Sequence, residues 1–175
     1  MRFEEQLKIG QAGESAIARW LISRGNVVLP VYEKILDTNK GPQLFTWDGS
    51  LVAPDMIAIK DKNVLWVEAK HKTAFTWHRI TGRWVTGIDL HHYQEYWKVR
   101  EQVGIPIWVL FLHRGGQAKD SPQNSPEGLF GNEIQILRAN ENHRHDNWGR
   151  TGMVYWARDV DGGALKKIAE LSALN

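Results

Sequence analysis

The chain of 175 residues is 42% hydrophobic and 24% charged, the composition of a globular protein able to bury a core in one domain, residues 1–175. Its net charge of +2 excludes a global positive field, so any nucleic-acid surface must be a local patch. Cysteine is absent, which excludes disulfides and thiolate zinc sites and agrees with a reducing cytoplasm. No apolar run reaches the length of about eighteen residues that spans a membrane, and the N-terminus, Met1 to Gln6, is too polar for a signal peptide.

The first part of the chain predicts a helix followed by a strand. Residues 3–24 predict the helix, because Ile17, Trp20 and Leu21 have the i, i+3, i+4 spacing of one helix face and Gly25 follows as a stop. Residues 26–32 predict the first strand. Further along, residues 43–47 predict either a short strand or a loop, and residues 48–50 predict a turn.

Two hairpins are predicted next. The apolar runs 54–60 and 64–70 flank the polar turn Asp61-Lys62-Asn63, which is typical of a β-hairpin. Residues 75–88 repeat the pattern, with two aromatic runs on either side of Thr81-Gly82-Arg83.

The middle of the chain predicts a helix at 89–103 and a buried central strand at 106–112. The segment 115–128 is rich in glycine, serine, glutamine and proline, so it predicts a mobile surface loop.

The last third predicts short elements. Residues 134–137 and 153–156 predict edge strands or short helical turns, and the polar stretch 140–150 predicts a solvated loop that is also a candidate for DNA contact. Residues 164–174 predict a C-terminal helix.

The chemistry is concentrated in the first hairpin. Side chains alternate along a strand, so Glu68 and Lys70 share one face, Ala69 takes the other, and Asp55 on the paired strand can lie beside Glu68. Two carboxylates bind Mg²⁺ through hard oxygen ligands, and the bound ion polarises a phosphate and lowers the pKa of a water. An ammonium beside them positions that water or offsets charge on the phosphate. The arrangement indicates metal-assisted phosphodiester hydrolysis.

A Glu-x-Lys triplet alone is weak evidence, since a solvated strand end with a surface ion pair has the same sequence. The surroundings favour the functional interpretation. The triplet ends a run too apolar for a surface strand, and Pro54-Asp55 opens the preceding run at a separation that suits a tight hairpin.

These residues resemble the core of the PD-(D/E)xK phosphodiesterase superfamily, with Pro54-Asp55 as the first element and Glu68-Ala69-Lys70 as the second. The resemblance implies a restriction-endonuclease-like fold of the α/β class, a mixed β-sheet flanked by helices. It also implies that Asp55, Glu68 and the backbone carbonyl of Ala69 bind Mg²⁺ or Mn²⁺, while Lys70 positions the nucleophile.

The residues Gly10 to Gly25 are similar to the first helix of the Holliday-junction-resolvase branch and of related phage nucleases. A glutamate on that helix reaches the metal site, and Glu14 is the matching residue, acting on the metal directly or through a bound water. The order of the following helix and strand also agrees. The resemblance covers residues 1–112, and residues 113–175 remain an unmatched extension of the same domain.

Basic and aromatic residues alternate after the catalytic triplet. Such interleaving holds single-stranded or distorted nucleic acid through phosphate contacts and base stacking. The residues with this expected role are Lys72, Trp77, His78, Arg79, Arg83 and Trp84. The alternative for Trp77 and Trp84 is a cross-strand pair that stabilises the second hairpin.

The histidines admit two interpretations. His91 and His92 with His143 and His145 could form a zinc site, but adjacent histidines on a helix do not easily share one ion. We favour DNA contact or water ordering by His91 and His92. Tyr93 has the same expected role, with packing in the core as the alternative.

The sequence therefore predicts a Mg²⁺- or Mn²⁺-dependent deoxyribonuclease that acts in a cytoplasm, with DNA as its partner and no membrane association. The resolvase-like helix favours branched or recombination-intermediate DNA, a homodimer and a phage or mobile-element origin. A non-specific or single-strand-selective nuclease and a catalytically silent DNA-binding module of the same fold are the alternatives.

Overall fold

The structure is a computed structural model that describes residues 3–31, 42–146, 151–159 and 162–174, with side chains described from residue 11 onward. Its main sheet has six strands in the order β1-β4-β5-β8-β9-β12. These strands are β1 (Val27–Pro30), β4 (Met56–Lys60), β5 (Asn63–Lys72), β8 (Ile107–Gln117), β9 (Asn124–Glu133) and β12 (Lys166–Ala169).

The main sheet is mixed, because β5 and β8 are parallel while every other neighbouring pair is antiparallel. A parallel pair needs a long crossover connection. Here the crossover contains β6 (Thr76–His78), β7 (Arg83–Asp89) and the helix α2 (Leu90–Val103).

A second sheet of four strands has the order β10-β11-β7-β6. It joins the crossover strands to β10 (His143–His145) and β11 (Met153–Ala157) from the last third of the chain. The strands β2 (Gln43–Thr46) and β3 (Gly49–Val52) form a separate two-stranded hairpin.

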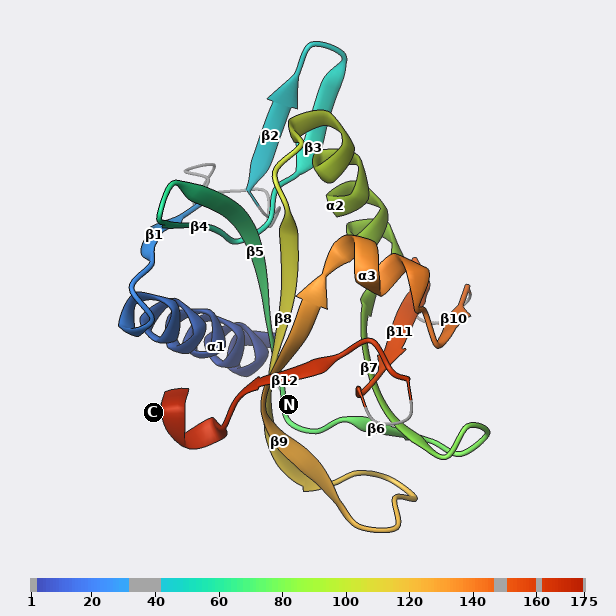
Figure 1. Ribbon diagram of the computed structural model, residues 1–175. Helices are drawn as coiled ribbons and strands as arrows, with labels where there is room; N and C mark the ends of the chain where they lie inside the picture. The colour runs from blue at the N-terminus through green and yellow to red at the C-terminus, as the bar shows by residue number, and fades with distance from the viewer. Residues whose placement is uncertain (1–2, 32–41, 147–150, 160–161, 175) are drawn as a thin grey trace.

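The helices cover both faces of the main sheet (Figure 1). The helix α1 (Phe3–Ser23) lies on one face, while α2, the short helix α3 (Ile134–Ala139) and the second sheet lie on the other. A 3-10 helix, Leu171–Leu174, ends the described chain. None of the described helices is long and apolar enough to cross a lipid bilayer.

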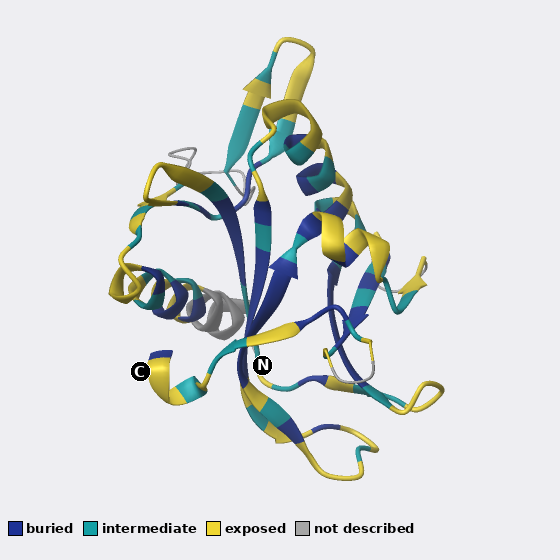
Figure 2. Ribbon diagram, in the orientation of Figure 1, coloured by how far each residue is buried: buried dark blue, intermediate teal, exposed yellow. Residues whose placement is uncertain are grey.

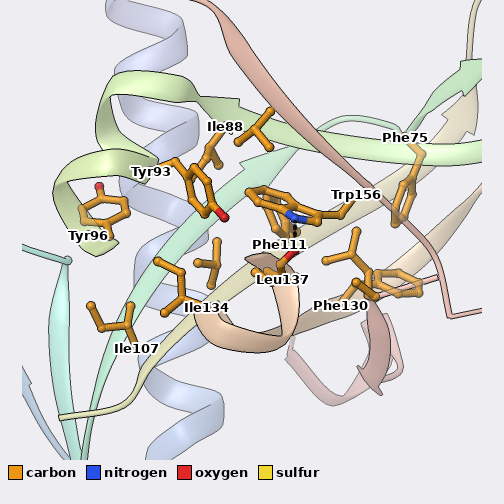
Figure 3. Packing of buried hydrophobic residues seen from close by; sticks show 14 of the residues in the cluster. Phe75, Ile88, Tyr93, Tyr96, Ile107, Phe111, Phe130, Ile134, Leu137 and Trp156 are labelled. Carbon is orange, nitrogen blue, oxygen red and sulfur yellow. Dashed lines mark hydrogen bonds between the residues drawn. The ribbon is translucent and has the colours of Figure 1, made fainter. Parts of the chain in front are cut away.

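Each face of the main sheet has its own core, and the central strands between them are buried (Figure 2). On one face Ile17 and Leu21 of α1 pack with Val67 and Leu110. The core on the other face is larger and is rich in aromatic side chains (Figure 3).

Trp156 occupies the larger core with no exposed surface (Figure 3). Its indole Nε1 donates a hydrogen bond of 2.8 Å to the carbonyl oxygen of Leu137, which satisfies the buried polar atom and fixes α3 against the second sheet.

The N-terminal predictions are confirmed. The helix α1 ends at Ser23, and Gly25 follows with a φ of 86°, a left-handed conformation that suits glycine at a helix end. The strand β1 lies within the predicted range, although Tyr32 is outside the described residues. The β4–β5 hairpin turns through Asp61 and Lys62, both with positive φ.

The segment 43–50 differs from the prediction in part. Residues 43–46 form a strand, which confirms one of the two alternatives, but the turn lies at Trp47-Asp48. Gly49 and Ser50 belong to β3, a strand that the sequence analysis did not predict.

The prediction of a loop at 115–128 holds only for residues 118–123 and is wrong for the remainder. The strands β8 and β9 pair as far as Gln117 and Asn124, leaving only the segment between them outside the ladder. The buried Ser125 hydroxyl also accepts a hydrogen bond of 2.8 Å from the Phe75 backbone nitrogen, which anchors β9 to the crossover. Glycine, serine and proline here serve an irregular strand rather than a loop.

Three predictions for the last third are also corrected. The C-terminal helix is wrong, because Lys166–Ala169 pairs with the free edge of β9 and only Leu171–Leu174 is helical. The strand β11 is not at an edge, since it lies between β10 and β7. The expected loop 140–150 contains β10, which pairs with β11. By contrast, the helical alternative for residues 134–137 is confirmed by α3.

Candidate active site

The β4–β5 hairpin brings Asp55 and Glu68 together. The ladder begins with Met56 opposite Val67, so Asp55, the residue before β4, lies across from Glu68. The Oδ2 atom of Asp55 accepts a hydrogen bond of 2.8 Å from the backbone nitrogen of Ala69. Glu68 is fully buried, which is rare for a carboxylate and requires compensation by a cation or by hydrogen bonds.

Lys70 supplies one such cation. It projects from the same face of β5 as Glu68 and forms an ion pair with it, while its own side chain remains 30% exposed. Burial alone would lower the pKa of the Lys70 ammonium, but Glu68 and Asp55 outweigh burial and raise that pKa above its usual value. Lys70 is therefore positively charged at neutral pH.

The helix α1 brings Glu14 to the same site. Gly13 packs so closely against β5 that an added Cβ atom would lie 2.3 Å from the Cβ of His71. This close approach sets the neighbouring Glu14 within the electrostatic field of Lys70 and Glu68. Burial and Glu68 raise the pKa of Glu14, and Lys70 partly offsets that effect.

The helix α2 adds two side chains that face the carboxylates. Tyr96 is 2% exposed, and burial together with Glu68 and Asp55 raises the pKa of its hydroxyl, which stays protonated as a potential donor. Burial and Lys70 lower the pKa of His92, which favours its neutral form. The start of α2 is fixed by Asp89, whose side chain accepts a hydrogen bond of 2.9 Å from the His91 nitrogen and contacts Thr151.

The sequence analysis did not assign Tyr96 to the site. The signal that could have found it is the i, i+4 spacing from His92, which puts both residues on one face of a helix. Their rings lie 6.2 Å apart between centroids.

The neighbouring carboxylates disfavour one another's ionised forms. Burial and the neighbouring Glu68 raise the pKa of Asp55 to about 8, and Glu14 contributes in the same direction. Three carboxylates thus share one partly buried region, where Lys70 is the ammonium paired with Glu68. A divalent cation would compensate their charge.

The donor set fits Mg²⁺ or Mn²⁺ through oxygen atoms. The N–H and C=O groups of one strand residue point toward the same neighbour, so the Ala69 carbonyl faces the side on which Asp55 lies. Within the described ranges, no group of three or more histidine, aspartate or glutamate side chains is positioned to hold a metal ion by itself. Mg²⁺ does not need one, because it usually keeps several waters and uses one or two carboxylates.

The structure of the second hairpin contradicts the expected DNA contact of Trp84. Trp77 and Trp84 form the cross-strand pair that the sequence left as an alternative, with ring centroids 5.1 Å apart. Trp84 is only 6% exposed and belongs to the larger core, so it cannot stack on a nucleobase in this conformation. Trp77 is half-buried.

The expected DNA contact of Tyr93 is also wrong. Tyr93 is 3% exposed, its ring packs edge-on against Trp156, and its hydroxyl donates a hydrogen bond of 2.8 Å to Glu141. Core packing, the alternative interpretation, is confirmed.

The other expected DNA-binding residues divide into two groups. Lys72 and His92 lie beside the carboxylate site, and burial together with Lys70 lowers the pKa of Lys72. The remaining residues lie at the surface or half-buried: His78, Arg79, Arg83 and His91. Of these, His78 stacks on His143 with centroids 4.1 Å apart.

The mixed sheet and the flanking helices form a resolvase-like fold. The structure is similar to that of Hjc, a Holliday junction resolvase from the archaeal hyperthermophile Archaeoglobus fulgidus, with a TM-score of 0.50 and 10% sequence identity. The similarity covers 85% of this chain and 83% of that chain. At this identity it establishes the fold. No protein-family model and no curated protein matches the sequence.

The structural similarity extends beyond residues 1–112, the part of the chain that carries the sequence resemblance. A match over 85% of the chain is more than residues 1–112 could supply, so part of residues 113–175 shares the fold. The strands β8 and β9 explain why, since they continue the main sheet through that segment.

Proposed function

We propose that this protein is a divalent-metal-dependent deoxyribonuclease that hydrolyses phosphodiester bonds of branched DNA. The observation that carries the proposal is the placement of Asp55 across from the buried Glu68, with Lys70 on the same strand face. Together with Pro54 before Asp55, this placement supports membership of the PD-(D/E)xK superfamily.

Each polar residue has a distinct role in the proposal. Asp55, Glu68 and the Ala69 carbonyl would hold Mg²⁺ or Mn²⁺, and Glu14 would bind a water of that ion. The ion supplies Lewis-acid polarisation of the phosphate and a water of lowered pKa. Lys70, held positive by the carboxylates, orients the attacking water and offsets negative charge that develops on the phosphate.

The choice of branched DNA rests on the fold of the Archaeoglobus protein, which is described as a Holliday junction resolvase. A resolvase cuts strands of opposite polarity, so we propose a two-fold homodimer with the same surface used by both copies. A nuclease without structural preference could act as a monomer.

The test uses purified protein with Mg²⁺ or Mn²⁺ and four DNAs of equal length: single-stranded, duplex, flapped and four-way junction. The proposal predicts a dimer by light scattering and at least tenfold preference for the junction over duplex, which is about 1.4 kcal/mol. A monomer that cuts all four DNAs equally would replace the resolvase assignment with a general nuclease. Absence of any metal-dependent cleavage would favour a DNA-binding module.

A further inference from the structure

The β2–β3 hairpin extends beyond the body of the molecule, next to α2 (Figure 1). Its tip carries two aromatic side chains with little protein around them. Trp47 is 97% exposed, more than any other large hydrophobic residue that the structure describes, and Phe45 is 76% exposed. Most of the surface of both side chains is therefore accessible to a ligand.

The base of this hairpin is anchored. Leu44, Leu51 and Val52 pack against the larger core. The backbone nitrogen of Ala53 donates a hydrogen bond of 2.8 Å to the carbonyl of Pro42, which ties together the two ends of the hairpin.

The tip itself is also ordered by a local contact. The hydroxyl of Thr46 donates to the Asp48 carboxylate at 2.7 Å, across the turn that carries Trp47. An aromatic side chain on an anchored hairpin loses little conformational entropy when it binds, because most of the ordering is already present.

The hairpin is continuous with the candidate active site. The strand β3 leads through the buried Ala53 and Pro54 directly to Asp55. Eight residue steps separate Trp47 from Asp55, which at the rise of an extended strand span about 26 Å. That is the length of about seven to eight base pairs of duplex, so one DNA molecule can reach both the tip and the carboxylates.

The tip fits nucleobases better than other partners. Two side chains offer far less area than the roughly 800 Å² that each partner buries in a stable protein interface. The charged side chain in the turn is Asp48, which repels anionic lipid headgroups and DNA phosphates alike, so contact at the tip itself is limited to the aromatic faces. Open aromatic faces, in contrast, are the groups on which unpaired bases stack irrespective of sequence.

We propose that Trp47 and Phe45 form a stacking wedge, which engages unpaired nucleobases of the DNA bound at the Asp55 site. This inference rests on the proposed nuclease function and deepens it, because it assigns recognition of unpaired bases at a branch or gap to a segment outside the catalytic residues.

The experiment measures DNA binding by fluorescence anisotropy in EDTA, which prevents metal-dependent cleavage. Two DNAs of equal length are compared, a full duplex and a duplex with a gap of about three nucleotides. We expect the parent to prefer the gapped DNA and Trp47→Ala to lose about tenfold in affinity for it, with little change for the duplex. Trp47→Phe should keep most of the preference, because it keeps an aromatic face.

A matched control is Ile80→Ala, which removes an apolar side chain 90% exposed between β6 and β7. It should bind both DNAs like the parent. Thermal midpoints of Trp47→Ala and Phe45→Ala should equal that of the parent, since exposed side chains contribute little to folding. A 2-aminopurine base in the gap should be quenched by the parent and not by Trp47→Ala.

The proposed wedge is contradicted if the parent shows no preference for gapped DNA. It is also contradicted if Trp47→Ala lowers the affinity for both DNAs equally. It is also overturned if Trp47→Ala abolishes self-association while gapped-DNA binding stays intact, which would assign the tip to a second copy of the chain. If the protein cleaves DNA through Asp55 but keeps its gap preference without Trp47, the wedge alone is wrong. If it neither binds nor cleaves DNA, the proposed function fails as well.

Discussion

The side chain of Asp55 accepts a hydrogen bond from the backbone nitrogen of Ala69 at 2.8 Å, at the end of the β4–β5 ladder. The ladder ends at the pair Met56 and Val67, so the Asp55 side chain takes the place of a backbone acceptor for the Ala69 N–H. The bond also fixes the Asp55 carboxylate beside that of Glu68. Because like charges so close repel, the pair is a natural site for a cation.

The first prediction concerns that cation. Saturating Mn²⁺ should raise the thermal midpoint, because an ion that binds only the folded state stabilises it by mass action, about 2.7 kcal/mol at a hundred times the dissociation constant. For a chain of this size each kcal/mol corresponds to roughly 2–4 °C. Asp55→Ala should lose the shift, as measured by differential scanning fluorimetry with and without Mn²⁺.

Asp61→Asn provides the control for the metal experiment. Asp61 is exposed in the turn of the same hairpin, and asparagine tolerates its positive φ. It should keep the Mn²⁺ shift. An undiminished shift in Asp55→Ala would place the ion elsewhere.

The second prediction concerns Lys70→Met, which keeps the volume of the side chain and removes its charge. Cleavage should fall on the order of a hundredfold while DNA binding persists, because the ammonium acts on charge that develops during the reaction. Single-turnover cleavage and anisotropy measure the two effects separately.

Lys70→Met should also destabilise the metal-free protein by up to about 3 kcal/mol, since the buried Glu68 loses its cation. Added Mn²⁺ should restore part of this loss in urea unfolding. Lys119→Met, an exposed lysine, should change neither property. Parent-rate cleavage by Lys70→Met would mean that the Glu-x-Lys triplet has no catalytic role.

The third prediction concerns His113, which is fully buried and stacks on Phe75 with centroids 3.7 Å apart. Burial, with Lys72 and His71 nearby, lowers the pKa of His113 to about 3. Between about pH 6.5 and pH 3 the unfolded chain therefore binds a proton that the folded protein excludes. The free energy of unfolding should fall as pH falls through this window, by about 1.4 kcal/mol per pH unit from this residue.

His113→Phe removes the titratable imidazole and keeps an aromatic ring against Phe75. The free energy of unfolding of this variant should therefore depend less on pH. Urea midpoints at pH 7, 6 and 5 provide the measurement. A parent-like slope in His113→Phe would assign the acid sensitivity to other groups.

The parts of the site that the sequence predicted are those with local signals. Apolar runs around Asp61-Lys62-Asn63 specify the hairpin, and the period of two along β5 then places Glu68 and Lys70 on one face. Glu14 required more than a local pattern, because only the resemblance to the resolvase helix connected a helix residue to a site far along the chain.

The parts that the sequence missed depend on tertiary contacts. Lys166–Ala169 has no strong strand pattern, and the free edge of β9 decides its conformation. Trp77 and Trp84 have equal aromatic character in the sequence and lie opposite each other on one face of the second sheet, but Trp84 is buried because β7 is an inner strand while β6 is at the edge. Tyr96 joins the site because α2 packs across the carboxylates.

The fourth prediction tests how α1 delivers Glu14. In an open helix Gly13→Ala would stabilise by up to about 1 kcal/mol through helix propensity. Here the new Cβ would lie 2.3 Å from that of His71, so we expect lower stability and displacement of Glu14 with reduced cleavage. A thermal midpoint above that of the parent would contradict the close packing of α1 on β5.

The most direct test of the central claim is the rate of metal-dependent phosphodiester cleavage in Asp55→Asn and Asp61→Asn, measured on one four-way junction with Mg²⁺ under single-turnover conditions. Both variants lose one carboxylate from the β4–β5 hairpin, but only Asp55 faces Glu68. The account predicts that Asp61→Asn cleaves at the parent rate and that Asp55→Asn is slower by a factor on the order of a hundred or more. Equal rates in the two variants would contradict it.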